Sequence, residues 1–193
     1  MLATVTVDEG SMERALVEAA RDGNRDAFAV LASRVVDGLY ATARAVLRDT
    51  DRAEDAVQET LVRCWRDLPS LRDADRFEAW LRRLLMHAIT DEFRRGRRFE
   101  AKVRVLRDEP TTTGEDSGLD DRDLIERAFR RLSIDHRAIL TLHHLVGLTL
   151  PEVAETLGIP LGTAKSRLHY AVEAMRAALE ADDRGTRATE VSA

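Results

Sequence analysis

The sequence predicts an all-α protein made of two small helical domains, and three observations support this class. Charged residues make up 34% of the 193 residues and aromatic residues only 5%, a composition typical of helical, highly soluble proteins. Apolar residues recur at three- and four-residue steps through most of the chain, which is the spacing of an amphipathic helix. One long polar and acidic stretch interrupts this pattern and predicts a linker between two domains.

The first domain is expected over residues 11–98, with four helices, because four amphipathic stretches follow one another with short breaks. Gly23 ends the first stretch, and Gly38 is a candidate kink in the second. Two capping boxes predict where the third and fourth helices begin: Asp51 with Glu54, and Asp75 with Glu78. The expected helices cover residues 11–22, 26–48, 51–67 and 75–98, and the last frays into the basic sequence RRGRR.

The second domain is expected over residues 120–182. Between the domains, residues 99–119 contain Pro110 and two glycines and have no apolar period over most of their length, which predicts a flexible linker. In the second domain an apolar stripe begins near Leu124, and Ser133 is placed to cap the helix that follows. The small, polar residues 183–193 are expected to form a disordered tail.

Residues 148–176 predict a helix-turn-helix. Thr149 and Glu152 form a capping box, and the short helix that they open stops at Gly158, which tolerates a left-handed backbone. A longer helix begins near Leu161, and its polar face is shaped to enter a DNA major groove. The expected inward stripe of this helix is Leu161, Ala164, Leu168, Val172, Met175 and Leu179. The alternative is an ordinary helical hairpin with a solvated polar face.

The net charge of −5 hides two blocks of opposite sign. Residues 76–107 hold ten lysines and arginines against four acidic residues, whereas residues 108–123 hold seven acidic residues and one arginine. Such separation predicts distinct surfaces for distinct partners.

Several classes of protein are disfavoured by the sequence. A single cysteine, Cys64, excludes an internal disulfide and fits a reducing cytoplasm, and inert packing is the favoured interpretation of this thiol over redox sensing. The first residues do not resemble a signal peptide, and no segment approaches the roughly 18 apolar residues of a membrane helix. The histidines lack the spacing of a zinc site, and no catalytic motif is found. We therefore expect a cytoplasmic protein without membrane insertion, metal, cofactor or enzymatic activity.

Three segments in a fixed order resemble the extracytoplasmic-function (ECF) group of bacterial sigma factors, over residues 24–180. AEDAVQETLVRCW is similar to the family's helix that binds the polymerase clamp, and FEAWLRRLLMHAITDEFRRGRR to the helix that reads the upstream edge of the melted promoter. GIPLGTAKSRLHYAVEAMR is similar to the recognition helix of the C-terminal domain. The resemblance implies a sigma region 2 domain and a sigma region 4 domain that direct promoter-specific transcription initiation.

The resemblance implies that core RNA polymerase binds through its clamp coiled coil and its flap. It assigns clamp docking to Asp55, Gln58, Glu59 and Arg63. Exposed carboxylates and an amide on a rigid helix suit charge-assisted hydrogen bonds to a basic partner. The alternative is a solvated acidic helix face, which is common in proteins of other families.

For the −10 promoter element, the resemblance points to the loop at residues 69–75 and the helix after it. The loop residues expected to bind DNA are Ser70, Arg72 and Asp73, and the helix residues are Arg82, Arg83, His87, Arg94, Arg95, Arg97 and Arg98. His87 stands where the family usually has asparagine, which puts the family's base preference at that edge in doubt. Trp65 and Trp80 could stack on bases, but both fall near apolar stripes and are expected in the core.

For the −35 element, the resemblance implies that Thr163, Lys165, Ser166, Arg167, His169 and Tyr170 contact DNA. Lys165 and Ser166 have the donors to read base edges, and Thr163 suits a phosphate at the helix start. Arg167 lies on the flank, where it contacts either phosphate or the protein itself. Tyr170 departs from the basic residue expected there, which puts its phosphate contact in doubt.

Further partners and two rival functions remain open at this stage. The resemblance implies an anti-sigma factor, a monomer when free of partners, and a linker threaded toward the RNA exit path; a plain solubilising tether is the alternative for the linker. The rivals are a stand-alone helix-turn-helix regulator with a helical partner-binding domain and a helical adaptor for acidic partners. A regulator that reads palindromes is usually a dimer, so the oligomeric state separates the first rival from a sigma factor.

Overall fold

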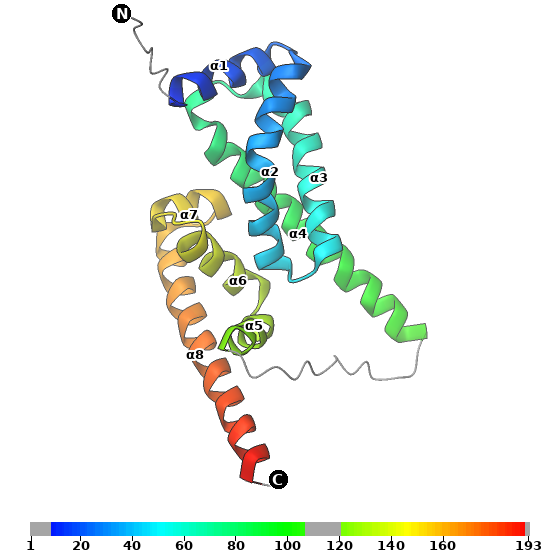
Figure 1. Ribbon diagram of the computed structural model, residues 1–193, viewed down its shortest axis with the longest axis vertical. Helices are drawn as coiled ribbons and strands as arrows, with labels where there is room; N and C mark the ends of the chain where they lie inside the picture. Colours follow the sequence, from blue (N-terminus) through cyan, green and yellow to red (C-terminus); the bar gives the residue numbers. More distant parts are fainter. Residues whose placement is uncertain (1–8, 107–120, 192–193) are drawn as a thin grey trace, which may run out of the picture.

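The computed structural model describes residues 9–106 and 121–191, and within these ranges every regular element is helical, which confirms the all-α prediction. Figure 1 shows two groups of helices, α1 to α4 and α5 to α8, packed against each other. The elements are α1 (Glu9–Arg21), α2 (Arg25–Leu47), α3 (Thr50–Asp67), η1 (Leu68–Ser70), η2 (Ala74–Arg76), α4 (Phe77–Leu106), α5 (Asp121–Arg131), α6 (Ile134–Leu140), η3 (Thr141–Leu145), α7 (Leu150–Leu157) and α8 (Leu161–Val191).

Helix α2 begins at a cap made by Asn24, whose side chain accepts hydrogen bonds from the backbone N–H groups of Asp26 and Ala27, both at 3.0 Å. The helix continues through Gly38, the candidate kink, and ends at Leu47, with Arg48 as its C-cap. Arg48 has a φ of 60°, in the left-handed region. For a residue other than glycine this conformation costs roughly 1–2 kcal/mol, so contacts of the Arg48 side chain must offset it.

The third helix begins earlier than its predicted capping box and the fourth begins later, so both boxes are wrong. Asp49, in an extended conformation, caps α3 by accepting from the N–H of Arg52 at 3.0 Å. Asp73 likewise caps the short turn η2, and α4 begins only at Phe77. In each case a second aspartate two positions upstream competes for the cap and has the extended backbone that a cap needs.

Helix α4 continues to Leu106, past the RRGRR sequence where fraying was expected. The first residues of the predicted 99–119 linker are therefore helical, and the rest of that linker lies outside the described residues. A Cβ on Gly96 would clash with the guanidinium of Arg52, so glycine at this position lets Arg52 of α3 lie directly against α4. This close approach explains a glycine inside a continuous helix.

The second group contains the predicted helix-turn-helix, α7 followed by α8. Ser133 caps α6 as predicted, and Gly158 ends α7 with a φ of 64°. Leu161 was expected inward but is 41% exposed, because it precedes the point at which α8 packs on its neighbours; Ala171 and Ala178 are buried instead. Helix α8 extends to Val191, so the expectation of a disordered tail from residue 183 is wrong over residues 183–191.

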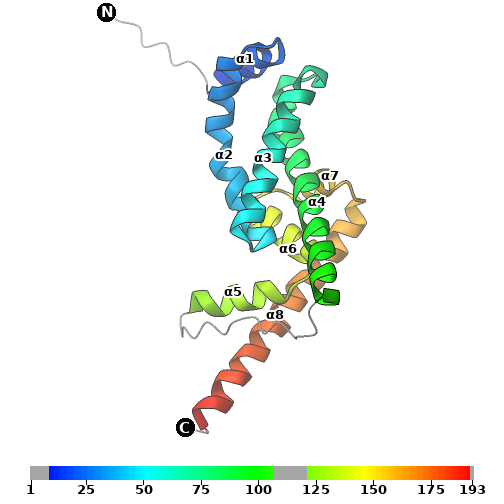
Figure 2. The ribbon, with the colours of Figure 1, turned by 90° about the vertical axis from the view of Figure 1, so that its right-hand side faces the viewer.

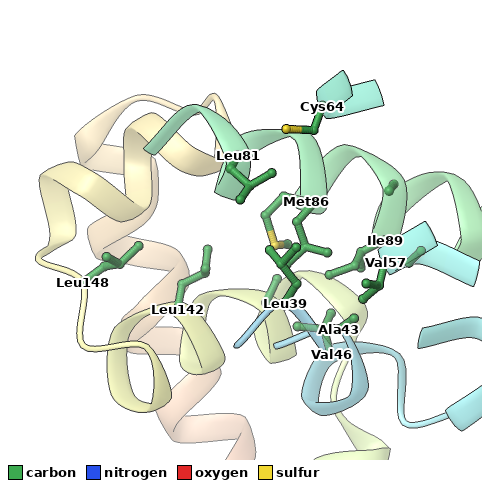
Figure 3. Close-up of a cluster of buried hydrophobic side chains, with 14 of the residues drawn as sticks. Leu39, Ala43, Val46, Val57, Cys64, Leu81, Met86, Ile89, Leu142 and Leu148 are labelled. Carbon is green, nitrogen blue, oxygen red and sulfur yellow. The ribbon is translucent and has the colours of Figure 1, made fainter. Parts of the chain in front are cut away.

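The two groups share one continuous apolar core, which the sequence did not predict. Figure 3 shows Leu142 and Leu148 of the second group facing Leu39, Leu81 and Met86 of the first. The contacts join α4 to α7 and α2 to α6 and η3. Figure 2 shows that α8 leads away from this shared region toward the C-terminus.

Candidate nucleic-acid interface

The candidate docking surface on α3 is open at its centre and tied down at one end. Asp55 and Gln58 are exposed, whereas Glu59 is half-buried. The Arg63 guanidinium donates to Glu59 Oε1 at 2.7 Å and to Asp91 Oδ2 of α4 at 2.9 Å. Hydrogen bonds to Asp91 and then Glu59 raise the pKa of Arg63. Arg63 therefore holds α3 against α4, and Asp55 and Gln58 are the groups left available to a partner.

Glu92 lies beneath this surface and is 6% exposed. Its Oε1 is 2.6 Å from Arg95 Nη1. Burial raises the pKa of Glu92, and Arg95 partly opposes the shift while Asp55 adds to it. Arg95, which was predicted to bind DNA, pairs with this buried carboxylate while its own side chain stays exposed.

The loop between α3 and α4 is held by its own backbone contacts. Ser70 Oγ donates to the carbonyl of Asp67 at 2.6 Å, and Asp73 Oδ1 accepts from the N–H of Asp75 at 3.1 Å. Both predicted DNA-binding side chains thus shape the loop. Arg72 between them is exposed and free to reach a ligand outside the loop.

The basic side chains of α4 divide into one strip and two flanks. Arg83, His87, Arg94 and Arg98 recur at steps of four and seven, so they lie on one face, and all four are exposed. Arg97 is exposed beside this strip. Arg82 is set apart, since its guanidinium pairs with Glu78 at 2.9 Å and is largely covered. The strip is a surface for phosphate, with donors spaced along about four helical turns.

Helix α7 covers one end of this strip. Glu155 Oε1 accepts a hydrogen bond from Arg83 at 3.3 Å and another from Arg76. The sequence did not point to Glu155, because nothing in the spacing of an exposed glutamate on α7 indicates a partner 72 positions upstream. The acceptor that pairs with Arg83, a candidate DNA-binding residue, and with Arg76 of η2 therefore comes from the other domain.

The two tryptophans pack against other aromatic side chains of the first domain but are less buried than the core position expected for them. Trp65 lies against Phe28 with ring centroids 5.0 Å apart, and Trp80 lies 6.3 Å from the ring of Phe77. Both side chains are half-buried. Neither is presented as a free platform for base stacking.

The helix-turn-helix presents the predicted polar face. Thr163, Lys165, Ser166, His169 and Tyr170 are all exposed. The Glu152 carboxylate accepts from the N–H of Thr149 at 2.8 Å and from its hydroxyl at 2.6 Å, and these bonds lower the pKa of Glu152. This interaction fixes the start of α7, on which α8 packs.

Within that polar face the side chains differ in how free they are. Ser166 Oγ donates back to the carbonyls of Gly162 and Thr163, at 3.2 and 3.1 Å. Arg167 is 3.6 Å from Asp135, a contact with the protein itself, which was one of the two roles considered for it. Lys165 makes no ion pair with any described residue, so its ammonium group is available to a base edge.

The described residues contain neither a cluster suited to a metal ion nor a helix suited to cross a membrane. No group of three or more histidine, cysteine or acidic side chains is arranged to hold a metal ion in the described ranges. Among the described helices, none is both long and apolar enough to cross a membrane.

Comparison with known proteins assigns both helical groups. The model of Sigma-70 region 2 matches residues 31–99, and that of Sigma-70, region 4 matches residues 122–175. The ECF RNA polymerase sigma factor SigL of Mycobacterium tuberculosis is 39% identical over 147 residues, which cover 74% of this chain and 82% of SigL.

Two solved structures resemble the whole arrangement. CnrH, in complex with the cytosolic domain of CnrY, has a TM-score of 0.63 and 29% identity, and the match covers 88% of this chain and 98% of CnrH. The sigma factor RpoE of Bartonella quintana, in complex with the anti-sigma factor NepR, has the same TM-score with 28% identity, over 80% of this chain and 98% of RpoE. Since both domains are matched in order, the chain belongs to the sigma-70 family of RNA polymerase sigma factors, in its extracytoplasmic-function group.

Proposed function

We propose that this sigma factor binds core RNA polymerase through α3 and directs it to promoters by reading a −10 element with α4 and a −35 element with α8. The observation that carries this proposal is the exposure of three separate polar faces, one on each helix, on a chain of the sigma family. A stand-alone regulator needs the face of α8 but neither of the others.

Docking is proposed to rest on Asp55 and Gln58. A carboxylate and an amide in one exposed patch can accept and donate hydrogen bonds to a basic helix such as the clamp coiled coil. Glu59 and Arg63 support docking indirectly. Arg63 forms ion pairs with Glu59 and with Asp91, and these pairs hold α3 in place on α4. The polymerase flap is the proposed second contact, with the C-terminal domain.

Promoter reading is proposed to divide between base contacts and phosphate contacts. On α8, the free ammonium of Lys165 suits guanine O6 and N7, while Thr163, His169 and Tyr170 extend the face along the groove. On α4, Arg83, Arg94, Arg97 and Arg98 suit phosphate, with His87 at the centre of the strip. The loop containing Arg72 stands next to the start of α4, where an extruded base of the melted strand would be held.

Weak affinity for DNA in the free protein fits its acidic total charge. The net charge is −5, and two of the basic side chains near α4 are neutralised by Glu155. When polymerase holds both domains, two weak readers act together through their high effective concentration on one promoter. We propose that the protein acts as a monomer in the cytoplasm, where polymerase and chromosome are found, and contributes binding energy rather than a catalytic group.

An anti-sigma factor is a further proposed partner. CnrH was solved in complex with the cytosolic domain of CnrY and RpoE in complex with the anti-sigma factor NepR, and the match to each covers at least four fifths of this chain. Co-purification of the native protein from non-inducing cells tests this partner, and recovery of the protein alone would count against it.

The central test is run-off transcription with purified bacterial core polymerase on a pool of randomised promoters. We expect transcripts that depend on this protein and share two motifs at a fixed spacing. DNA retained by the protein alone, without such transcripts, would instead favour the stand-alone regulator.

A further inference from the structure

Helix α1 is not used by any of the functions proposed above. It covers Glu9–Arg21, whereas the match to Sigma-70 region 2 begins at residue 31. Figure 1 shows α1 at the end of the first domain where the chain passes from α3 to α4. There α1 contacts both η1 and η2, the two short turns on either side of Arg72. The helix therefore lies against the loop that is proposed to hold an extruded base.

Burial anchors this loop at its two ends but not between them. Leu68 at one end and Ala74 at the other are buried, and both belong to the apolar core that includes Val17 of α1. Arg72 and Asp73 between them are exposed. Apolar packing thus fixes where the loop begins and ends, and the shape of its exposed part depends on polar contacts.

Arg14 supplies a polar contact to the loop from α1. Its Nη1 donates to Asp75 Oδ2 of η2 at 2.8 Å, and its Nε donates to Glu18 Oε1 at 3.1 Å. Glu18 lies one helical turn along α1, so two carboxylates hold the guanidinium at once and restrict its orientation. Hydrogen bonding to Glu18, and then the charge of Asp75, raise the pKa of Arg14.

We propose that Arg14 is a positioning residue for reading the −10 element, because it ties the loop that carries Arg72 to α1. The Asp75 N–H donates to Asp73 Oδ1 at 3.1 Å, so the residue that Arg14 holds is joined to the neighbour of Arg72. A site for an extruded base needs a fixed shape, and contacts outside the site supply that rigidity. This role rests on the proposed reading function, whereas the contact itself does not.

The contribution of the contact should be modest. The Arg14 and Asp75 side chains are 52% and 61% exposed, so water and salt weaken their attraction. An exposed ion pair changes an equilibrium by about fivefold at most. Removing it should therefore loosen the loop and leave α1 in place, since Val17 and Ala20 hold that helix in the core.

The first test is hydrogen exchange of the full chain without polymerase or DNA. The reporters are the N–H groups of Leu71, Asp75 and Arg76, whose acceptors lie within the loop segment at 3.0, 3.1 and 3.2 Å. Arg14→Met should speed their exchange by about fivefold or less and leave the thermal unfolding midpoint near that of the wild type. The matched control is Arg21→Met, which removes the same charge from α1 but from a side chain that pairs with its neighbour Asp22. It should leave these exchange rates unchanged.

The second test is promoter opening by the full chain with core polymerase, on promoters changed at single −10 positions. Arg14→Met should lower discrimination at one −10 base by about fivefold or less, with the affinity for core polymerase and the −35 preference unchanged. Asp75→Ala should cause the same loss. The double variant should lose no more than either single variant, because the same contact is removed.

Three outcomes would overturn the positioning role of Arg14. The first is an Arg14→Met variant that matches the wild type in loop exchange or in −10 discrimination. The second is an equal loss from Arg21→Met, which would assign the effect to the charge of α1. The third is a loss from Arg14→Met with none from Asp75→Ala, which would make Arg14 a direct DNA contact. If the wild type discriminates at no −10 base, the proposed reading function fails, and the exchange rates still decide whether Arg14 holds the loop.

Discussion

At the scale of single residues, Cys64 shows how burial controls chemistry. Its side chain is 1% exposed inside the first domain, and burial, with a smaller contribution from Asp67, raises the pKa of the thiol from 9.0 to about 12. The thiolate is the reactive form, so almost none is present at physiological pH. The structure therefore supports inert packing over redox sensing.

We predict that Cys64 reacts with a thiol reagent such as DTNB only when the protein unfolds. Folding raises the pKa, so the folded state keeps a proton that the unfolded state releases. The stabilising effect of the neutral thiol is complete below pH 9 and is lost as the pH rises toward 12. Reaction rates in buffer and in denaturant measure this difference. Rapid reaction of the folded protein at neutral pH would contradict it.

At the scale of elements, the amphipathic period predicted most helices but not where they begin or end. Apolar spacing is repeated over many residues, whereas a start is decided by one cap among several candidates. Asp49 and Asp51 both have the side chain of a helix N-cap. The left-handed backbone at Arg48 turns the chain so that Asp49, and not Asp51, stands at the start of α3. Likewise α4 passes through Gly96 because Arg52 packs against it, a contact between helices that local pattern does not contain.

The same limit applies to the candidate surfaces. The exposure of Asp55, Gln58 and Lys165 follows from their place off the apolar stripe, so the sequence predicted it. The ion pairs of Arg63 with Asp91 and of Arg83 with Glu155 join different helices, and no spacing along one helix predicts them. Whether a polar side chain is free for a partner is therefore decided by packing.

For helix α3 we predict that Asp55→Ala with Gln58→Ala abolishes binding to core polymerase and leaves the fold intact. Each lost charge-assisted hydrogen bond costs about 1.5–3 kcal/mol of binding, whereas exposed substitutions usually change stability by less than about 0.5 kcal/mol. Competition for core polymerase and thermal unfolding measure the two quantities. Asp22→Ala, which removes one exposed carboxylate from the turn after α1, is the control. A double variant that competes like the wild type would show that docking lies elsewhere.

For the two reading helices we predict different effects of removing one cation. Lys165→Ala should change base preference within the −35 element, at a cost of about 1–3 kcal/mol for the preferred base. Arg97→Ala should weaken binding evenly across sequences and lower the salt slope by about 1. Affinities of the polymerase complex for promoter variants at several salt concentrations separate the two. Equal losses on all sequences from both variants would argue against the division between α8 and α4.

At the scale of the whole molecule, the arrangement of the domains controls which surfaces are available. Apolar contacts around Leu142 join the domains, and the shared ion pairs of Glu155 lie at the edge of this contact. The Arg76, Arg83 and Glu155 side chains are 61%, 44% and 43% exposed, so solvent and salt weaken their attraction. Such a contact can bias the arrangement of the domains without locking it.

We therefore predict that Glu155→Gln shifts the free protein toward open arrangements. Exposed ion pairs contribute at most about 1 kcal/mol, so the open fraction should rise by about fivefold or less, with the apolar contact still opposing full separation. Energy transfer between dyes placed on α1 and near the end of α8 measures the change. Rising salt should produce the same shift in the wild type and little further change in the variant.

Glu173→Gln is the matched control, because Glu173 is also an exposed glutamate but pairs with Arg176 within α8. It should leave the arrangement unchanged. If both variants open the molecule alike, net charge rather than the Glu155 contact holds the domains together. If neither variant opens the molecule while salt still does, the ion pairs of Glu155 are not the contact on which closure depends. The pair to remove next is then Arg48 with Glu126, which also joins the two domains.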